Sequence, residues 1–155
     1  MGEIIHGYDP ALIIPARYRF SQIGFLRPLK EFVKRNEGGL DLNPVAVKMT
    51  PGGRYAGVEG FKNAIIAFAE GRKINLFVMN DKFDAIPYGF FPDVDHRYID
   101  RLNDESPVSF VRVEENIWRA RRKGVKSMED VVRANIGQLN LAWVEVLKRE
   151  ISIKH

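Results

Sequence analysis

The segment from residue 43 to residue 79 constrains the fold most, because it reads as strand, tight turn, strand, helix and strand in direct succession. Val45, Val47 and Met49 alternate along the first strand, as apolar residues do on one face of a sheet. The Pro51-Gly52-Gly53 sequence that follows is typical of a hairpin turn, since proline fixes φ and glycine accepts a positive φ. Residues 54–58 are predicted to return as the partner strand.

A helix is predicted to follow this hairpin, because Phe61, Ile65 and Phe68 recur at positions i, i+4 and i+7. Residues 74–79, INLFVM, form an almost continuous apolar run of strand length, which indicates a strand buried on both faces. The segment therefore predicts a mixed α/β (α+β) fold, with a small mixed sheet flanked by helices.

The turn between the second strand and this helix is the strongest chemical signal in the sequence. A helix N-terminus offers backbone N–H groups and the positive end of the helix dipole, and Lys62 adds a charge in the first turn. We therefore expect a phosphate group to bind here, at Gly60, Phe61, Lys62 and Asn63. The alternative is purely structural: the glycine permits an unusual φ, and the lysine is solvated.

Glu59 precedes this turn and is the candidate catalytic residue, as a general base or as a carboxylate associated with magnesium. The patterns GxxxxGK[ST] and GxGxxG are both absent, which argues against an ordinary P-loop nucleotidase. No GxSxG turn is present either, so a hydrolase triad is not expected.

Before this segment, residues 1–9 are expected to form a loose leader, and residues 11–14 a short opening strand between two prolines. Arg17 and Arg19 follow at a spacing of two and therefore point the same way on a strand. They are either a solvated face or a pair of guanidinium groups facing an anion. A helix is predicted over residues 28–36.

After the segment, residues 80–93 are predicted to form a turn-rich loop. Asp93 or Asp95 is expected to cap a short helix, and residues 108–113 to form a further strand. The group Asp93, Asp95, His96 and Asp100 offers oxygen and imidazole ligands, but its spacing matches no known metal loop, so we predict no metal site.

A basic helix is predicted from Glu114 to the stop at Gly124, and a capped helix from Ser127 to about residue 150. The buried stripe of the second helix could pack on its own sheet or on a second copy, as a homodimer. With the turn between them, the two helices have the outline of a helix-turn-helix, and the alternative is a solvated helical face. The candidate nucleic-acid contacts are Arg119, Arg121, Arg122 and Lys123.

Composition narrows the function classes further. The 155 residues include no cysteine, which excludes disulfides, thiolate catalysis and cysteine-based metal centres. No apolar run approaches the roughly 18 residues of a membrane span, so we expect a cytoplasmic protein without a membrane partner. The formal net charge of +4 permits a polyanionic partner such as DNA or RNA but does not require one.

The order IIPARYR, a helix, and then NPVAVKMTPGGRYAGVEGFKNAIIAFAEGRKINLFV resembles the N-terminal domain shared by ParB partition proteins, sulfiredoxin and the archaeal free-serine kinases. The resemblance covers about residues 11–79. Pro15 and Arg17 or Arg19 match the opening of the family pattern, and the Glu59-Gly60 pair matches its acid-glycine motif.

The resemblance implies a ParB-like domain over residues 1–93, followed by a helical extension over residues 94–155. It also implies that the loop after Gly60 holds nucleotide phosphates, of CTP, ATP or ADP with Mg²⁺. Where the family usually has arginine, this chain has Lys62, which cannot make a bidentate guanidinium contact. Sulfiredoxin activity is excluded because it needs a cysteine at this loop.

Two hypotheses follow for the function. In the first, the chain is a ParB-like binding protein for a nucleotide phosphate, DNA or both, in plasmid, viral or chromosome maintenance. In the second, it is an enzyme that uses the same turn for nucleotide hydrolysis, phosphotransfer or DNA cleavage. A third interpretation, an interaction protein that uses the aromatic loop at residues 83–91, also remains open.

Overall fold

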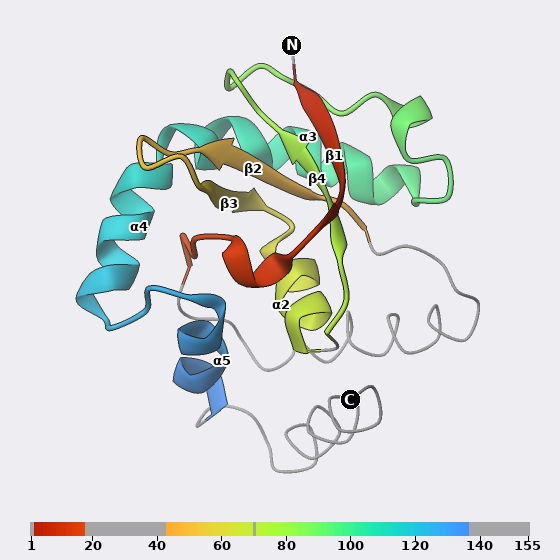
Figure 1. The fold of residues 1–155 in the computed structure, drawn as a ribbon. Helices are drawn as coiled ribbons and strands as arrows, with labels where there is room; N and C mark the ends of the chain where they lie inside the picture. Colours follow the sequence, from red (N-terminus) through yellow and green to blue (C-terminus); the bar gives the residue numbers. More distant parts are fainter. Residues whose placement is uncertain (1, 18–42, 70, 137–155) are drawn as a thin grey trace.

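The computed structural model describes residues 2–17, 43–69 and 71–136, which form a four-stranded mixed sheet with helices packed on both faces (Figure 1). The strands are β1 (Glu3–Tyr8), β2 (Val45–Met49), β3 (Tyr55–Glu59) and β4 (Ile74–Val78). Their order is β1-β4-β2-β3, and only the central pair, β2 and β4, is parallel. The predicted mixed α/β fold is confirmed.

The predicted hairpin between β2 and β3 is confirmed. Met49 pairs with Tyr55 beside a turn in which Gly53 has φ of 79°, and the Thr50 amide donates to the Arg54 carbonyl at 2.8 Å. The predicted helix is also confirmed, as α2 (Phe61–Ala69), and it connects β3 to β4.

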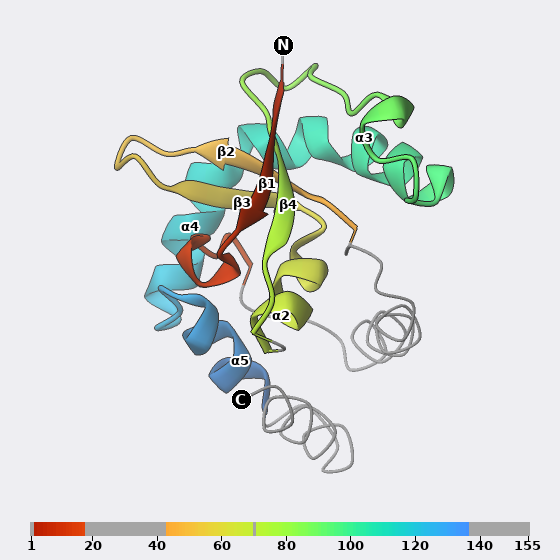
Figure 2. The same cartoon turned by 45° about the vertical axis from the view of Figure 1, so that its right-hand side comes forward.

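Alternation along the strands divides the core into two clusters on opposite faces of the sheet. Val45 and Val47 of β2 belong to the first cluster, whereas Ala46 between them belongs to the second. The first cluster includes residues of α2 and α5 (Met128–Ile136), and the second includes residues of α3 (His96–Val111). The helix α4 (Val113–Arg122) contributes Ala120 to the first cluster and Val113 and Ile117 to the second. Figure 2 shows α4 near one end of β2 and β3.

The predicted loose leader is wrong, because residues 3–8 form the edge strand β1, antiparallel to β4. Ile4 packs against the second cluster and Ile5 against the first, so the strand uses apolar side chains on both faces. The sequence did not indicate a strand here, because polar and glycine residues such as His6 and Gly7 interrupt the apolar pattern.

The predicted opening strand at residues 11–14 is also wrong. Residues Pro10–Leu12 form a 3-10 helix, η1, in which the Ala11 amide donates to Asp9 Oδ1 at 3.0 Å. Proline at the first helical position and aspartate before it favour this turn over an extended chain. Only Ile14 makes a strand-like bridge, to Ala56 of β3.

The predicted strand at residues 108–113 is wrong as well. The helix capped by Asp95 does not end after two turns but continues to Val111, and α4 begins at Val113. A short apolar run fits a helix as well as a strand, and here the helix is extended from an established N-terminus. The predicted cap is confirmed, since Asp95 Oδ1 accepts from the Arg97 amide at 2.8 Å.

The predicted stop of the basic helix is confirmed by Gly124, which has φ of 80°. The Ser127 cap is confirmed too, because its Oγ accepts from the Asp130 amide at 3.2 Å. The helix predicted over residues 28–36 and the continuation of α5 toward residue 150 lie outside the described residues. Val132, the first residue of the predicted buried stripe, lies within α5 and packs against the first cluster, and the homodimer stays a prediction. The domain boundary at residue 93 stays a prediction.

Between residues 2 and 136, apart from the two gaps in the description, no helix is both long and apolar enough to cross a membrane.

Candidate anion site at the start of helix α2

Gly60 makes the turn from β3 into α2 and is required there for two reasons. Its φ of 80° lies in the left-handed region that favours glycine. A Cβ atom at this position would also collide with the Tyr98 hydroxyl and lie 3.1 Å from the Pro44 carbonyl oxygen. The glycine therefore has a structural role, whether or not the turn binds a ligand.

The Tyr98 hydroxyl of α3 closes one side of this turn. It donates to the Pro44 carbonyl at 2.7 Å and accepts from Asn63 Nδ2 at 3.0 Å. The side chain of Asn63, predicted as a phosphate contact, is thus hydrogen-bonded to α3. The Asn63 amide donates to the Gly60 carbonyl at 3.0 Å.

Phe61, another predicted phosphate contact, has its side chain in the core. The ring is 5% exposed and belongs to the first cluster, where it covers Gly57 of β3. A ligand at this turn would therefore meet the main chain of Phe61 and not its ring.

Lys62 is the cation of the first turn, and further cations lie around it. Burial lowers the pKa of its ammonium group, and the positive charges of Arg17 and Arg101 lower it further. The negative charges of Glu105 and Glu59 oppose this shift with a smaller effect. Burial is thus the main cause of the lowered pKa of Lys62, and the two nearby arginines add to it.

Glu59 lies at the end of β3, directly before the turn. Burial raises the pKa of its carboxyl group, since a charge is costly away from water. The hydrogen bond donated by Ser109 Oγ to Glu59 Oε1 and the charge of Arg17 oppose the shift, while Glu105 adds to it. The carboxyl group therefore keeps its proton to a higher pH than an exposed glutamate does.

Of the two predicted arginines, Arg17 acts electrostatically on both Glu59 and Lys62, and Arg19 lies outside the described residues. Sequence reasoning missed the contribution of α3, which supplies Arg101, Glu105 and Ser109. Their spacing of four residues places them on one helix face. That spacing was readable, but nothing in the sequence indicated that this face packs against the turn.

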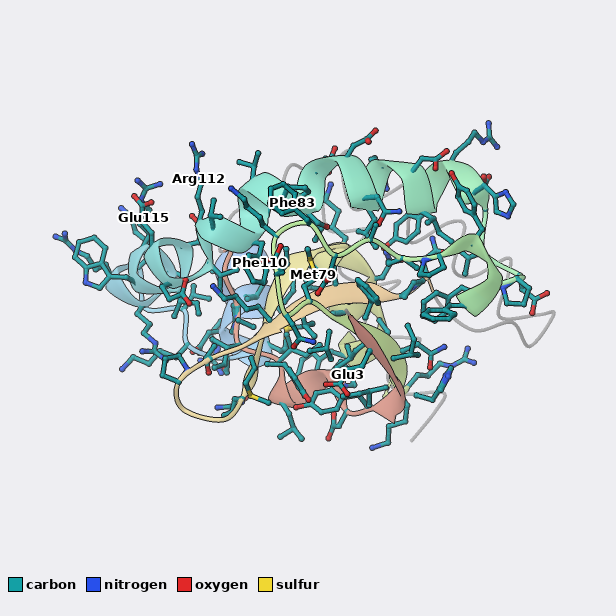
Figure 3. The ribbon with its side chains drawn as sticks, turned by 90° about the horizontal axis from the view of Figure 1, so that it is seen from above. Glu3, Met79, Phe83, Phe110, Arg112 and Glu115 are labelled. Carbon is teal, nitrogen blue, oxygen red and sulfur yellow. The ribbon has the colours of Figure 1, made fainter. Side chains whose placement is uncertain are left out.

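The predicted basic cluster lies on the exposed side of α4. Arg119 pairs with Glu115 at 2.5 Å, and the Arg122 guanidinium lies 4.8 Å from the centre of the Trp118 ring. Figure 3 shows Glu115 projecting outward from the corner where α3 meets α4. Arg121 and Lys123 are exposed as well.

The acidic and histidine residues at the start of α3 are engaged in local contacts. Asp95 caps the helix, His96 stacks on Tyr88 with ring centres 4.5 Å apart, and Asp100 accepts a hydrogen bond from the Tyr88 hydroxyl. Among the described residues, no three histidine or acidic side chains are grouped to hold a metal ion.

Comparison with known proteins identified no relative of this chain. No protein-family model matches the chain, and neither a curated protein nor a solved structure matches it. The fold is thus established by the structure alone, and the ParB-like character of the chain stays a prediction.

Proposed function

We propose that this chain is a ParB-like protein that binds the phosphate groups of a nucleotide at the turn from β3 into α2. The observation that carries the proposal is the gathering of Lys62, Arg17 and Arg101 around the N-terminus of a nine-residue helix. The first turn of that helix contains no acidic residue. Positive side chains near the positive end of a helix dipole favour an anion there.

Side-chain cations carry more of this proposed site than the sequence pattern suggested. The Asn63 amide and side chain are already hydrogen-bonded, and the Phe61 ring is buried. Lys62 lies in the first turn of α2 and forms no ion pair with a carboxylate of the described residues, so it is the group that we propose contacts a phosphate. The carboxyl groups of Glu59 and Glu105 lie close by and are of the kind that holds a phosphate-bound Mg²⁺.

Isothermal titration calorimetry with CTP, ATP and ADP, each with Mg²⁺, tests the proposal. We expect Lys62→Gln to weaken binding by about tenfold or more, the scale of a charge-assisted hydrogen bond. Lys73→Gln removes the same charge directly before β4, in the connection that follows α2, and serves as the matched control. No heat with any nucleotide, or equal affinity in the two variants, would contradict the proposal.

A second candidate function is catalysis, and the buried Glu59 carboxyl favours it. A carboxyl group with a raised pKa beside a phosphate site is suited to act as a general base. The chemistry would be nucleotide hydrolysis, phosphotransfer of the free-serine-kinase type, or DNA cleavage. Ser109 would orient the carboxyl group through its hydrogen bond.

The test of catalysis is turnover with Mg²⁺, measured as phosphate release, phosphate transfer and plasmid nicking. We expect Glu59→Gln to abolish the activity, whereas Glu3→Gln on the exposed edge strand leaves it unchanged. The absence of all three activities in the wild-type protein would exclude this candidate.

The nucleic-acid part of the proposal concerns α4. Its exposed cations Arg119, Arg121 and Arg122, with Lys123 at the helix end, are of the type that contacts backbone phosphates. Because Arg119 already pairs with Glu115, the remaining three cations carry most of this role. Fluorescence anisotropy with labelled nucleic acid at low salt tests it, and no binding would contradict it.

A further inference from the structure

The exposed face of α4 combines an indole ring with neighbouring cations. Trp118 is 57% exposed, an unusual position for the largest apolar side chain. Arg121 and Arg122 follow it at i+3 and i+4 and therefore share its helix face. The guanidinium of Arg122 lies over the ring, 4.8 Å from its centre. The ring thus stays largely open to solvent while a positive charge is held beside it.

The acidic residues of α4 are already neutralised. Glu114 pairs with Lys48 at 3.1 Å, and Glu115 pairs with Arg119 at 2.5 Å. The cations that follow them form no ion pair with a carboxylate of the described residues: Arg121, Arg122, Lys123 and Lys126.

The helix after the turn does not continue this positive surface. On α5, Arg133 pairs with Glu129 at 2.8 Å and with Asp130 at 3.5 Å, so two carboxylates accompany one cation. A duplex reader of the helix-turn-helix type places this second helix in the major groove, close to the phosphates. The charges of α5 disfavour that arrangement, so in the described parts of these two helices the unpaired cations lie in the C-terminal half of α4.

A structural explanation accounts for only part of the surface. Cations in the last turn of a helix interact favourably with its dipole, which explains Arg121 and Arg122 without a ligand. It does not explain an exposed tryptophan between them and the paired acids. An aromatic face beside unpaired cations is the combination on which nucleobases stack while phosphates are bound.

We propose that the C-terminal half of α4 binds single-stranded nucleic acid, with one unpaired base stacked on Trp118 and phosphates contacted by Arg121, Arg122 and Lys123. A single strand is required because the bases of a duplex are stacked on one another and offer no face to the indole. The inference rests on the nucleic-acid part of the proposed function and names the class of strand. It is independent of nucleotide binding at α2.

Fluorescence anisotropy of the full chain with labelled oligo(dT), oligo(U) and a duplex of equal length tests the inference. We expect Trp118→Leu to weaken single-strand binding by at least about fivefold, the lower end of a stacking contribution. Trp118→Phe keeps an aromatic face and should retain most of the affinity. The oligo(dT) and oligo(U) arms tell DNA from RNA.

Charge variants complete the test. Replacing Arg121 and Arg122 by glutamine should reduce the salt dependence of binding, since fewer counterions are released. Arg133→Gln removes a charge from α5 and should leave the affinity unchanged, which controls for net charge.

Three results would overturn the inference. The first is single-strand binding that Trp118→Leu leaves unchanged. The second is tight duplex binding that depends on the arginines and not on Trp118, which would leave the nucleic-acid part of the proposed function standing. The third is that the chain binds no strand and instead self-associates in a way that Trp118→Leu removes. This result would assign the surface to a protein contact, and it would contradict the inference and the nucleic-acid part of the proposed function.

Discussion

At the scale of single residues, Gly60 and Gly124 distinguish two reasons why a side chain destabilises a turn: backbone strain at positive φ, and steric collision with a neighbouring element. Both have φ of 80°, but a Cβ atom collides with Tyr98 at Gly60 and meets nothing within 4 Å at Gly124. Gly124→Ala should therefore cost about 1–2 kcal/mol of backbone strain. Gly60→Ala should cost more, because the turn must also move away from α3.

The measurement for this pair is urea denaturation of both variants. Equal losses in the free energy of unfolding would show that α3 does not press on the turn at Gly60. If only Gly60→Ala lowered the free energy of unfolding, the backbone around residue 124 would have to relax and relieve the left-handed strain in Gly124→Ala.

The raised pKa of the Glu59 carboxyl group predicts how stability depends on pH. Because burial raises its pKa in the folded state, its contribution to stability is present at low pH and is lost as pH rises through that folded pKa. The Ser109 hydroxyl donates to the carboxylate and lowers the pKa, so Ser109→Ala should raise the pKa further.

Carbon-13 NMR titration of the Glu59 carboxyl group measures this shift directly. The matched control is Ser106→Ala, one turn away on α3, because the buried Ser106 hydroxyl has no hydrogen-bond partner among the described residues. A Glu59 pKa that responds equally to the two substitutions, or that lies below the usual glutamate range, would contradict the account.

At the scale of elements, α3 fixes the turn through one hydroxyl group. Tyr98→Phe removes the hydrogen bonds to Pro44 and Asn63 while keeping the ring in the core. We expect a loss of about 1–3 kcal/mol, since the buried Pro44 carbonyl and the half-buried Asn63 amide are left without this partner. Tyr88→Phe, which removes an exposed hydroxyl that bonds to Asp100, should change stability by less than about 0.5 kcal/mol. Thermal or urea unfolding compares the two variants, and equal effects would contradict this role for α3.

A substitution in the edge strand β1 tests whether residues 3–8 belong to the folded core or form a loose leader. Ile5→Ala should destabilise the fold by about 1–2 kcal/mol, because Ile5 packs against the first core cluster. His6→Ala, at the neighbouring exposed position, should have little effect. Urea denaturation checks both, and a neutral Ile5→Ala variant would show that β1 is not part of the folded core.

The sequence predicts an element correctly when the residues that determine the element lie close together in the chain. The hairpin around Gly53 and the caps at Asp95 and Ser127 each lie within a few residues, and all were predicted correctly. β1 was missed because its apolar residues are few and its stability comes from pairing with β4, about 70 residues away. The strand expected at residues 108–113 failed because a short apolar run has no period of its own.

At the scale of the whole molecule, the candidate site is assembled from three distant parts of the chain. Arg17 follows β1 and η1, Lys62 lies in the first turn of α2, and Arg101 comes from α3. The sequence predicted the first two through a local turn and a resemblance. It gave no sign of Arg101, because only the packing of α3 on the sheet brings that face to the turn.

The central claim is that phosphate groups bind at the start of α2. It is tested most directly by amide NMR titration of the full chain with CTP and, in parallel, with cytidine, which lacks phosphate. The account predicts that CTP shifts the amide signals of Gly60, Lys62 and Asn63 and that cytidine does not, with the CTP effect lost in Lys62→Gln. Signals at this turn that stay unchanged at saturating CTP, ATP and ADP, or that respond equally to cytidine, would contradict it.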